Sequence, residues 1–509
     1  GFPANASAFE GRIFVEGQNL SIGPGGGFSL TIPASATGPV DWLTATATSL
    51  SPTDQPLNTS AFSAGVRVSA PLLAVGTGGP ASPGVVNPPA ARIYNIGDLA
   101  EADLEPANLS PSMNVSATGI GNENLAAVYG MDFAQNFTGG LRVAKADLDG
   151  DGYADLITAP GPLATGLANT FGESLLKVGI FNGNPAGEWT TASIDLSSEF
   201  GDDYTGGFLV AVGDVERTTG LSSVAAIDQV LIAPSASTGL FNGVAVYTVA
   251  PAERGGMPTP VDVTTTETLA GTITGLTTGA FVGPDDQMSI GVATTANGVT
   301  TVGIYNNSLS GFQQQSSFTA TLALNEGDGE KKNVFRNGAS LEAADLNGDF
   351  VDELVVGSGF MGMSNFRVIA GPAVIAGNQV QINNALGTNT APFSSIMSGG
   401  RFNNFVSPPG VDPAQQQTNL DFYLNEPVPP FTGLGFNAPL VVQAIESDGD
   451  GSAEILVTFS GINSTGNLIK RFSFVDDVNP ADRWSVLQGL RATDLGTGTF
   501  HLGEGLWLG

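Results

Sequence analysis

Three short acidic loops, far apart in the chain, carry oxygen-bearing side chains at one spacing. They run from Asp147 to Asp155, from Asp345 to Glu353 and from Glu446 to Glu454. Each places a carboxylate or amide side chain at positions 1, 3, 5 and 9. Ca²⁺ prefers six to eight oxygen ligands at roughly 2.3–2.6 Å, and a tight loop with alternating inward side chains supplies them. The shared spacing therefore predicts three Ca²⁺ sites of one design.

The backbone carbonyl of position 7 is an expected further ligand in each loop. The predicted ligands are Asp147, Asp149, Asp151, Tyr153 and Asp155 in the first loop, Asp345, Asn347, Asp349, Val351 and Glu353 in the second, and Glu446, Asp448, Asp450, Ser452 and Glu454 in the third. The second loop departs furthest from the pattern, because Asn347 replaces a carboxylate and Phe350 replaces a glycine. The alternative interpretation of each loop is an acidic, solvated turn.

The residues around the loops indicate strands. An EF-hand needs a bidentate Glu at position 12 and a helix on each side, whereas position 12 of the first loop is Thr158. Short β-branched runs flank the loops, such as Leu141–Ala146 before the first and Leu354–Ser358 after the second. Such runs next to Gly and Pro are typical of strands. We therefore expect hairpins of strand, calcium loop and strand.

The composition favours an all-β protein. The 509 residues include 69 Gly and 31 Pro, only 13% are charged, and 41% are hydrophobic. Many short strands joined by turns have this profile, and the apolar content is sufficient for a substantial core.

The loops belong to a longer repeat. A turn led by an aromatic residue precedes strands at Phe137–Gly140, Tyr204–Gly207 and Phe335–Gly338, with a third calcium-loop lead at Phe436–Ala438. Degenerate copies around Asp214 and Asp285 lack the full ligand set. From Asp147 the steps to Asp214, Asp285 and Asp345 are 67, 71 and 60 residues. Units of this size holding four short strands predict propeller blades.

The run from Phe137 to Gly161 resembles an FG-GAP repeat, the kind found in integrin α-subunit propellers and in VCBS-like repeats of secreted bacterial proteins. The resemblance covers roughly residues 65 to 480. It implies a Ca²⁺-binding β-propeller of six or seven four-stranded blades in an extracellular setting. We expect an N-terminal β segment over residues 1–62, as a cap or as strands that pair between subunits. The propeller is expected over 63–509, with an insertion around 371–434 and ring closure by residues 484–488 and 499–503.

The charge excludes several partners. The chain carries 17 Lys and Arg against 48 Asp and Glu, a net charge of −31. Nucleic-acid binding requires clustered cations and is not expected. No apolar stretch approaches the roughly 20 residues of a membrane helix, so no membrane insertion is expected. Without cysteine, disulfides are excluded. We expect a secreted or cell-surface protein whose signal peptide has been removed.

Residues suited to catalysis are few. His501 is the single histidine, and no cysteine is present. A lone histidine is more often a packing or surface residue than a general base, and no nucleophile elbow with a matching partner is evident. The sequence therefore predicts no catalytic residue and a protein that is not an enzyme.

Two functional classes remain open. The first is a calcium-stabilised propeller in cell-surface structure or adhesion, which associates with itself or with other surface proteins and glycans. The second is a polysaccharide-binding module or carbohydrate-active enzyme that uses one propeller face. Its candidate sugar platforms are the four tryptophans, Trp42, Trp189, Trp484 and Trp507.

Overall fold

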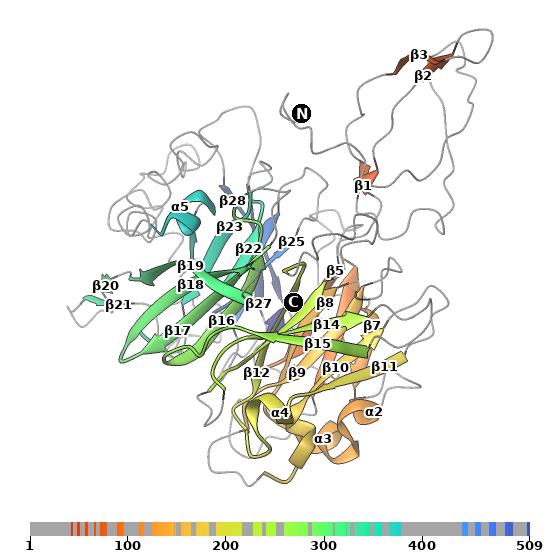
Figure 1. The fold of residues 1–509 in the computed structure, drawn as a ribbon, viewed down its shortest axis with the longest axis vertical. Helices are drawn as coiled ribbons and strands as arrows, with labels where there is room; N and C mark the ends of the chain where they lie inside the picture. The colour runs from red at the N-terminus through yellow and green to blue at the C-terminus, as the bar shows by residue number, and fades with distance from the viewer. Residues whose placement is uncertain are drawn as a thin grey trace.

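The strands of the chain group into antiparallel sheets that follow one another in sequence order (Figure 1). The computed structural model describes residues 42–43, 48–50, 56–59, 66–67, 72–78, 89–95, 111–116, 125–146, 148, 154–163, 169–182, 190–215, 228–236, 241–250, 259–282, 288–308, 311–321, 323–325, 331–333, 335–346, 351–358, 366–369, 371–377, 440–445, 453–459, 468–474, 484–491 and 506–508.

Four sheets are each built from four strands that are consecutive in the chain. The first is β8 (Leu141–Ala146), β9 (Asp155–Pro160), β10 (Lys177–Asn182) and β11 (Thr190–Asp195). The second is β12 (Phe208–Gly213), β13 (Gln229–Pro234), β14 (Ala245–Ala250) and β15 (Thr259–Thr265). The third is β16 (Thr272–Gly279), β17 (Ser289–Ala296), β18 (Val299–Ser308) and β19 (Gly311–Ala320). The fourth is β25 (Leu440–Ile445), β26 (Glu454–Phe459), β27 (Leu468–Phe474) and β28 (Trp484–Arg491).

Two further sheets of three or more strands are present in the described residues. One has three strands, β22 (Ala339–Ala344), β23 (Glu353–Ser358) and β24 (Phe366–Ile369). The other joins the two ends of the chain: β29 (Leu506–Leu508) pairs with β5 (Leu72–Thr77), which pairs with β6 (Ala90–Asn95) and through it with β7 (Pro111–Ser116). In this sheet Leu506 lies opposite Thr77 and Leu508 opposite Val75. Ring closure was expected from 484–488 and 499–503, but β28 pairs with β27 and the closing strand is β29.

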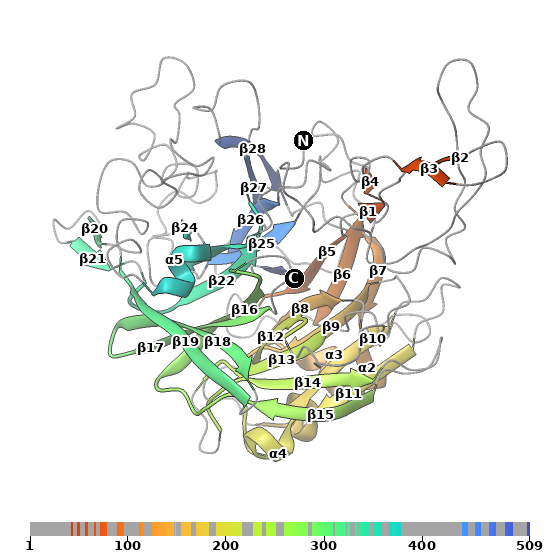
Figure 2. The ribbon, with the colours of Figure 1, turned by 45° about the horizontal axis from the view of Figure 1, so that its top comes forward.

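The sheets are arranged as in a propeller. Their innermost strands contact one another in sequence, from β29 to β8, β12, β16, β22 and β25. In Figure 2 the sheets spread outward around a common centre. The all-β propeller arrangement is thus confirmed. The described residues hold four complete blades of consecutive strands, however, where the sequence predicted six or seven. In the sheet of β5, β6 and β7 the inner strand is β29, from the C-terminal part of the sequence. The sheet of β22, β23 and β24 has three described strands.

The hydrophobic core is divided into clusters that lie between neighbouring sheets. One cluster joins β8–β11 to β12–β15 and includes Ile157, Ile180, Phe208 and Ile232. Similar clusters lie on either side of it and farther around the ring. Both faces of a strand such as β9 are therefore buried, and all six of its residues are classed as buried. This explains why the second strand of each repeat reads as a continuous apolar run in the sequence.

A glycine in the left-handed region precedes the first strand of four sheets. These are Gly140, Gly207, Gly271 and Gly338, with φ of 79°, 71°, 89° and 117°. Side chains other than glycine rarely adopt this conformation. At two of the four, the glycine carbonyl accepts a hydrogen bond from the residue after the second strand: Gly161 N to Gly140 O is 2.9 Å, and Ser235 N to Gly207 O is 2.9 Å. The aromatic turns recognised in the sequence thus end in a shared backbone geometry.

Short helices, which the sequence did not predict, connect the strands. They are α2 (Leu125–Tyr129), α3 (Met131–Asn136), the 3₁₀ helix η4 (Gly172–Leu176), α4 (Ser197–Phe200) and α5 (Gly371–Ala376). Tyr129 attaches α2 to strands β9 and β10. Its hydroxyl donates to the Thr158 carbonyl at 2.7 Å and accepts from Gly179 N at 3.0 Å. None of the helices in the described part of the chain is long and apolar enough to cross a membrane.

The remaining strands are short. They are β1 (Trp42–Leu43), β2 (Thr48–Leu50), β3 (Pro56–Thr59), β4 (Val66–Arg67), β20 (Ala323–Asn325) and β21 (Lys331–Asn333). β1 pairs with β4 and β2 pairs with β3. The pairing of β1 with β4 crosses the predicted boundary at residue 62, and the division into 1–62 and 63–509 stays a prediction. Most of the expected insertion lies in 378–434, outside the described residues.

Candidate functional site

The three acidic loops connect the first and second strands of their sheets, as predicted: β8 to β9, β22 to β23, and β25 to β26. Of the predicted ligands, the described residues include Asp155, Asp345, Val351, Glu353 and Glu454. The others lie outside them: Asp147, Asp149, Asp151, Tyr153, Asn347, Asp349, Glu446, Asp448, Asp450 and Ser452. Within the described part of the chain, no group of three acidic or histidine side chains is arranged to hold a metal ion. The calcium sites therefore stay a prediction.

The acidic residue at position 9 is buried in all three loops. Asp155, Glu353 and Glu454 are each the first residue of a second strand, and their exposed fractions are 0%, 1% and 2%. In the first loop Leu148 N donates to Asp155 Oδ2 at 2.9 Å, and in the second Leu346 N donates to Glu353 Oε2 at 3.0 Å. The position-9 carboxylate thus holds the backbone of position 2, an interaction that we call the loop brace.

The degenerate copy at Asp214 keeps the brace with a neutral side chain. Val215, the residue after Asp214, donates its N–H to Gln229 Oε1 at 2.7 Å. Gln229 is 4% exposed and opens β13, as Asp155 opens β9. The eleven-residue interruption from Arg217 to Ile227 therefore left the brace in place, while the carboxylate was exchanged for an amide. This agrees with the expectation that the Asp214 copy lacks a full ligand set.

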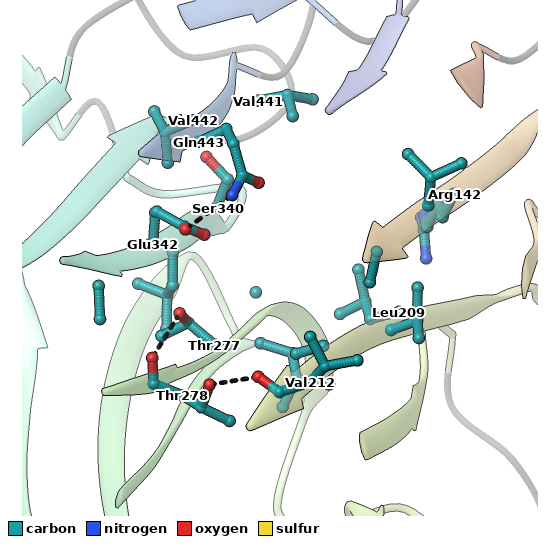
Figure 3. Close-up of a pocket in the computed structure, with 18 of the residues that line it drawn as sticks. Arg142, Leu209, Val212, Thr277, Thr278, Ser340, Glu342, Val441, Val442 and Gln443 are labelled. Carbon is teal, nitrogen blue, oxygen red and sulfur yellow. Dashed lines mark hydrogen bonds between the residues drawn. The ribbon is translucent and has the colours of Figure 1, made fainter. Parts of the chain in front are cut away.

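A cavity of about 280 Å³ lies where the innermost strands meet. Its walls come from β8, β12, β16, β22 and β25, and Figure 3 shows their side chains around an open centre. Small-molecule sites typically measure roughly 300–1,000 Å³, so the cavity suits a group the size of a single small ring. The lining is mixed: apolar side chains of these strands alternate with polar and charged ones.

Glu342 of β22 is the acidic side chain at the centre of this polar set. Gln443 of β25 donates from Nε2 to Glu342 Oε1 at 3.0 Å, and Figure 3 shows the two side chains at one edge of the cavity. The pKa of Glu342 is raised to about 8, mainly by burial and to a smaller degree by the charge of Asp352, while a backbone hydrogen bond from Ala444 and the charge of Lys145 oppose the rise. At neutral pH the carboxyl group is therefore largely protonated.

Two cations come from β8. Lys145 is half-buried, and Arg142 is 8% exposed. Burial lowers the pKa of Arg142 to about 10, and the neighbouring Tyr204 opposes this shift, so the guanidinium is still charged at neutral pH. Figure 3 shows Arg142 across the cavity from Glu342 and Gln443. Asp352 also lines the cavity, but its Oδ2 accepts from Ala280 N at 2.6 Å, which ties it to the chain after β16.

The cavity was not predicted from the sequence. Its signal is nevertheless present, because Arg142, Lys145 and Glu342 are charged residues inside strands whose neighbouring positions are apolar. The tryptophans predicted as sugar platforms cannot be compared with it: Trp189 and His501 lie outside the described residues, and the side chains of Trp42, Trp484 and Trp507 are not among those described.

No protein family matches this chain by sequence, and no curated protein does. Among solved structures, the exotype rhamnogalacturonan lyase YesX aligns with a TM-score of 0.30 and 11% identity, over 80% of this chain and 74% of that one. The Bacillus licheniformis rhamnogalacturonan lyase PL11 aligns with a TM-score of 0.27 and 11% identity, over 60% and 63%. Rhamnogalacturonan lyase YesW aligns with a TM-score of 0.27 and 10% identity, over 65% and 62%. The chain thus spans less than two thirds of the latter two proteins.

The prediction that the protein is not an enzyme is contradicted by this comparison, whose matches named above are lyases. That prediction rested on the scarcity of His and Cys, which excludes some nucleophilic mechanisms but not chemistry by Glu, Lys, Arg or Tyr side chains. At these identities the likeness concerns the fold alone and assigns no reaction or substrate to this chain. The resemblance to FG-GAP repeats has no family match and stays a prediction.

Proposed function

We propose that the protein is a carbohydrate-binding or carbohydrate-active β-propeller whose ligand enters the central cavity. The supporting observation is the set of polar side chains in the cavity wall: Glu342 and Gln443 on one side, with Lys145 and Arg142 from β8. Carboxyl, amide and guanidinium groups each present several hydrogen-bonding atoms in one plane. Such groups can bind neighbouring hydroxyls of a sugar ring, and convergent polar groups in a concave site are typical of ligand sites.

This cavity favours the carbohydrate alternative over a role in surface structure or adhesion, which would not require an internal polar site. We make two further proposals, on the number of blades and on the location of the protein. The contact sequence of innermost strands, from β29 around to β25, supports a ring of six blades. An extracellular location accords with a cysteine-free, acidic chain that binds glycans.

Binding of soluble polysaccharides tests the carbohydrate proposal. Affinity gel electrophoresis against a panel of neutral and acidic polysaccharides should show retardation of the protein by at least one member. Gln443→Leu should weaken the retardation by roughly tenfold, which is about 1.4 kcal/mol, because it removes the group that holds Glu342. Gln315→Leu, on the exposed side of β19, is the matched control. Turnover would be read from the same mixtures as new reducing ends. A folded protein that no polysaccharide retards would contradict the proposal.

We also propose that the acidic loops bind Ca²⁺. The donor set fits a hard cation, because it consists of carboxylate, amide and carbonyl oxygens. The position-9 carboxylates support the proposal, because they are buried at the same place in all three loops, as a shared ligand spacing requires. Metal bound only to the folded state would stabilise it by mass action. In this arrangement the brace fixes the loop ends, and the ion would neutralise the remaining carboxylates.

Substitution of Asp155 separates the two contributions. Asp155→Asn keeps an oxygen that can accept from Leu148 N but removes the charge, whereas Asp155→Ala removes both. We expect added Ca²⁺ to raise the melting temperature of the parent by more than that of either variant. In chelator, Asp155→Ala should lose about 1–3 kcal/mol because Leu148 N is left unsatisfied, and Asp155→Asn should lose less. Gln229→Ala is the control, with a calcium-independent loss. Equal calcium responses in all four proteins would overturn the metal proposal.

A further inference from the structure

We propose that the central cavity is an anion site, and that its ligand is the carboxylate of an acidic sugar held by Lys145 beside the Glu342–Gln443 pair, with Arg142 adding positive charge from across the cavity. The choice of a sugar rests on the proposed function, whereas the choice of an anion rests on the cavity alone. The inference therefore narrows the ligand from carbohydrate in general to the acidic sugars.

The first argument is the local charge. The ionisable side chains that line the cavity are Arg142, Lys145, Glu342 and Asp352. With Glu342 protonated, their sum is 2 − 1 = +1, in a chain whose net charge is −31. A positive cavity in a strongly acidic protein is opposite in sign to its surroundings, and charge interactions are stronger there than in bulk water. The cavity therefore attracts an anion locally, although the surface as a whole does not.

The second argument is the state of Glu342. Its acceptor atom Oε1 already receives the Gln443 amide at 3.0 Å, and burial keeps its pKa near 8. A neutral carboxyl group can donate a hydrogen bond to an anion, whereas an ionised one repels it. The charged groups that face Glu342 are Lys145 from β8 and Asp352 from the β22–β23 loop. The lining segments 209–212 of β12 and 274–278 of β16 contain no ionisable side chain.

The third argument is an unused hydroxyl. Ser340, two residues before Glu342 on the same face of β22, lines the cavity (Figure 3). Its Oγ is buried and has no hydrogen-bond partner among the described residues. Thr277 and Thr278 of β16 supply further hydroxyls, although Thr278 Oγ1 already donates to the Val212 carbonyl at 2.6 Å. A polar ligand in the cavity could supply the hydrogen-bond partner that Ser340 lacks.

The test compares two sugars that differ in one group. Sodium D-glucuronate and D-glucose are titrated into the full chain by calorimetry at pH 6.5 and pH 9. We expect glucuronate to bind at least tenfold more tightly than glucose at pH 6.5, and to lose most of this advantage at pH 9, where Glu342 is ionised. Glu342→Gln should bind glucuronate about equally at both pH values, because it keeps the acceptor for Gln443 without a titratable proton.

Lys145 provides the second arm. Lys145→Met should weaken glucuronate binding about tenfold more than it weakens glucose binding, and Lys145→Arg should restore most of this difference. Lys177→Met on β10 makes the same change of net charge away from the cavity and is the matched control. Melting temperatures establish that each variant is folded, and Arg142, which is more deeply buried, is left intact for this reason.

The outcomes separate the two proposals. Equal affinity for both sugars, or glucuronate binding that Lys145→Met does not alter, would overturn the anion site and leave the carbohydrate proposal standing. Binding of acetate with the expected dependence on pH and Lys145, but of no sugar, would support the anion site and contradict the carbohydrate proposal.

Discussion

Glu342 is the residue through which pH should act on stability. An unfolded glutamate releases its proton near pH 4.5, whereas the buried one keeps it until about pH 8. Between these values the folded state holds a proton that the unfolded state has lost, so the free energy of unfolding falls as the pH rises. Above pH 8 both states are ionised, and the loss is complete and constant.

Glu342→Gln should remove this dependence. We expect the variant to melt at a higher temperature than the parent at pH 9. Near pH 4 the two should differ little, because Glu342 of the parent is then largely protonated in both the folded and the unfolded state. Thermal melts at half-unit pH intervals measure the effect. The exposed Glu173 on η4 provides the control, because Glu173→Gln makes the same substitution away from the cavity. A profile for Glu342→Gln that runs parallel to that of the parent would contradict the assignment.

For single residues, the sequence predicted which acidic side chains stand at the loop positions better than it predicted what those side chains contact. The spacing of Asp155 and Glu353 within their loops was evident from the chain, and both lie at the expected start of a second strand. Their hydrogen bonds to Leu148 and Leu346 could not be predicted, because they depend on the register of a hairpin. The pair of Glu342 and Gln443 was missed for a similar reason: the residues are 101 positions apart and meet only in the ring.

The turn before each first strand is the element on which the packing of neighbouring sheets depends. Gly207 has φ of 71°, and a Cβ added there would collide with the backbone of Gly161 and Pro162 in the preceding sheet. Gly207→Ala should therefore combine backbone strain with a steric clash between sheets. The glycines of these turns were evident in the sequence, but the backbone that packs closely against them was not.

We expect Gly207→Ala to lower the free energy of unfolding by more than about 2 kcal/mol, because strain and clash add. Gly172 isolates the strain, because it also has a positive φ, of 53°, but a Cβ added there would meet no atom within 4 Å. Gly172→Ala should lose only the roughly 1–2 kcal/mol of the left-handed conformation. Urea denaturation of both variants gives the comparison. Equal losses would show that close approach between the sheets contributes nothing at Gly207.

The strands were predicted well because short β-branched runs next to turn residues recur along the sequence, as in β8, β9 and β23. The helices α2 and α3 were not predicted, because five or six residues are too few for a helical period to be recognised. Their stability comes instead from tertiary contacts: Tyr129 and Phe133 stack with ring centroids 4.6 Å apart, and Phe133 stacks on Phe137 at 4.3 Å.

At the scale of the whole molecule, β29 closes the ring. Its pairing with β5 covers an edge that would otherwise present unpaired backbone groups. Removal of residues 506–509 should therefore lower the melting temperature and promote association through β5. Light scattering and thermal melts measure the two effects. Removal of residues 323–325, in the small β20–β21 sheet outside the ring, is the comparison. A truncated protein that stays monomeric with an unchanged melting temperature would contradict this role for β29.

The propeller arrangement was predictable from the repeat, whereas the strand that closes it was not. Residues 506–508 form only three residues of strand, a length that carries no periodic signal. The number of complete blades was overestimated because repeat spacing was taken to imply four consecutive strands per unit, and the sheet of β5, β6 and β7 instead takes its fourth strand, β29, from far along the chain.

The pairing of β5 with β29 also sets an order of events during synthesis. The two strands are separated by 506 − 77 = 429 residues. At translation rates of about 5–20 residues per second, β5 would be made roughly 20–90 s before its partner exists. Throughout that interval the other propeller sheets can form from strands that follow one another, while the sheet of β5, β6 and β7 has an open inner edge at β5. The nascent chain is thus exposed to mispairing at β5 until β29 has been made, and a chaperone that shields strand edges would have its effect there.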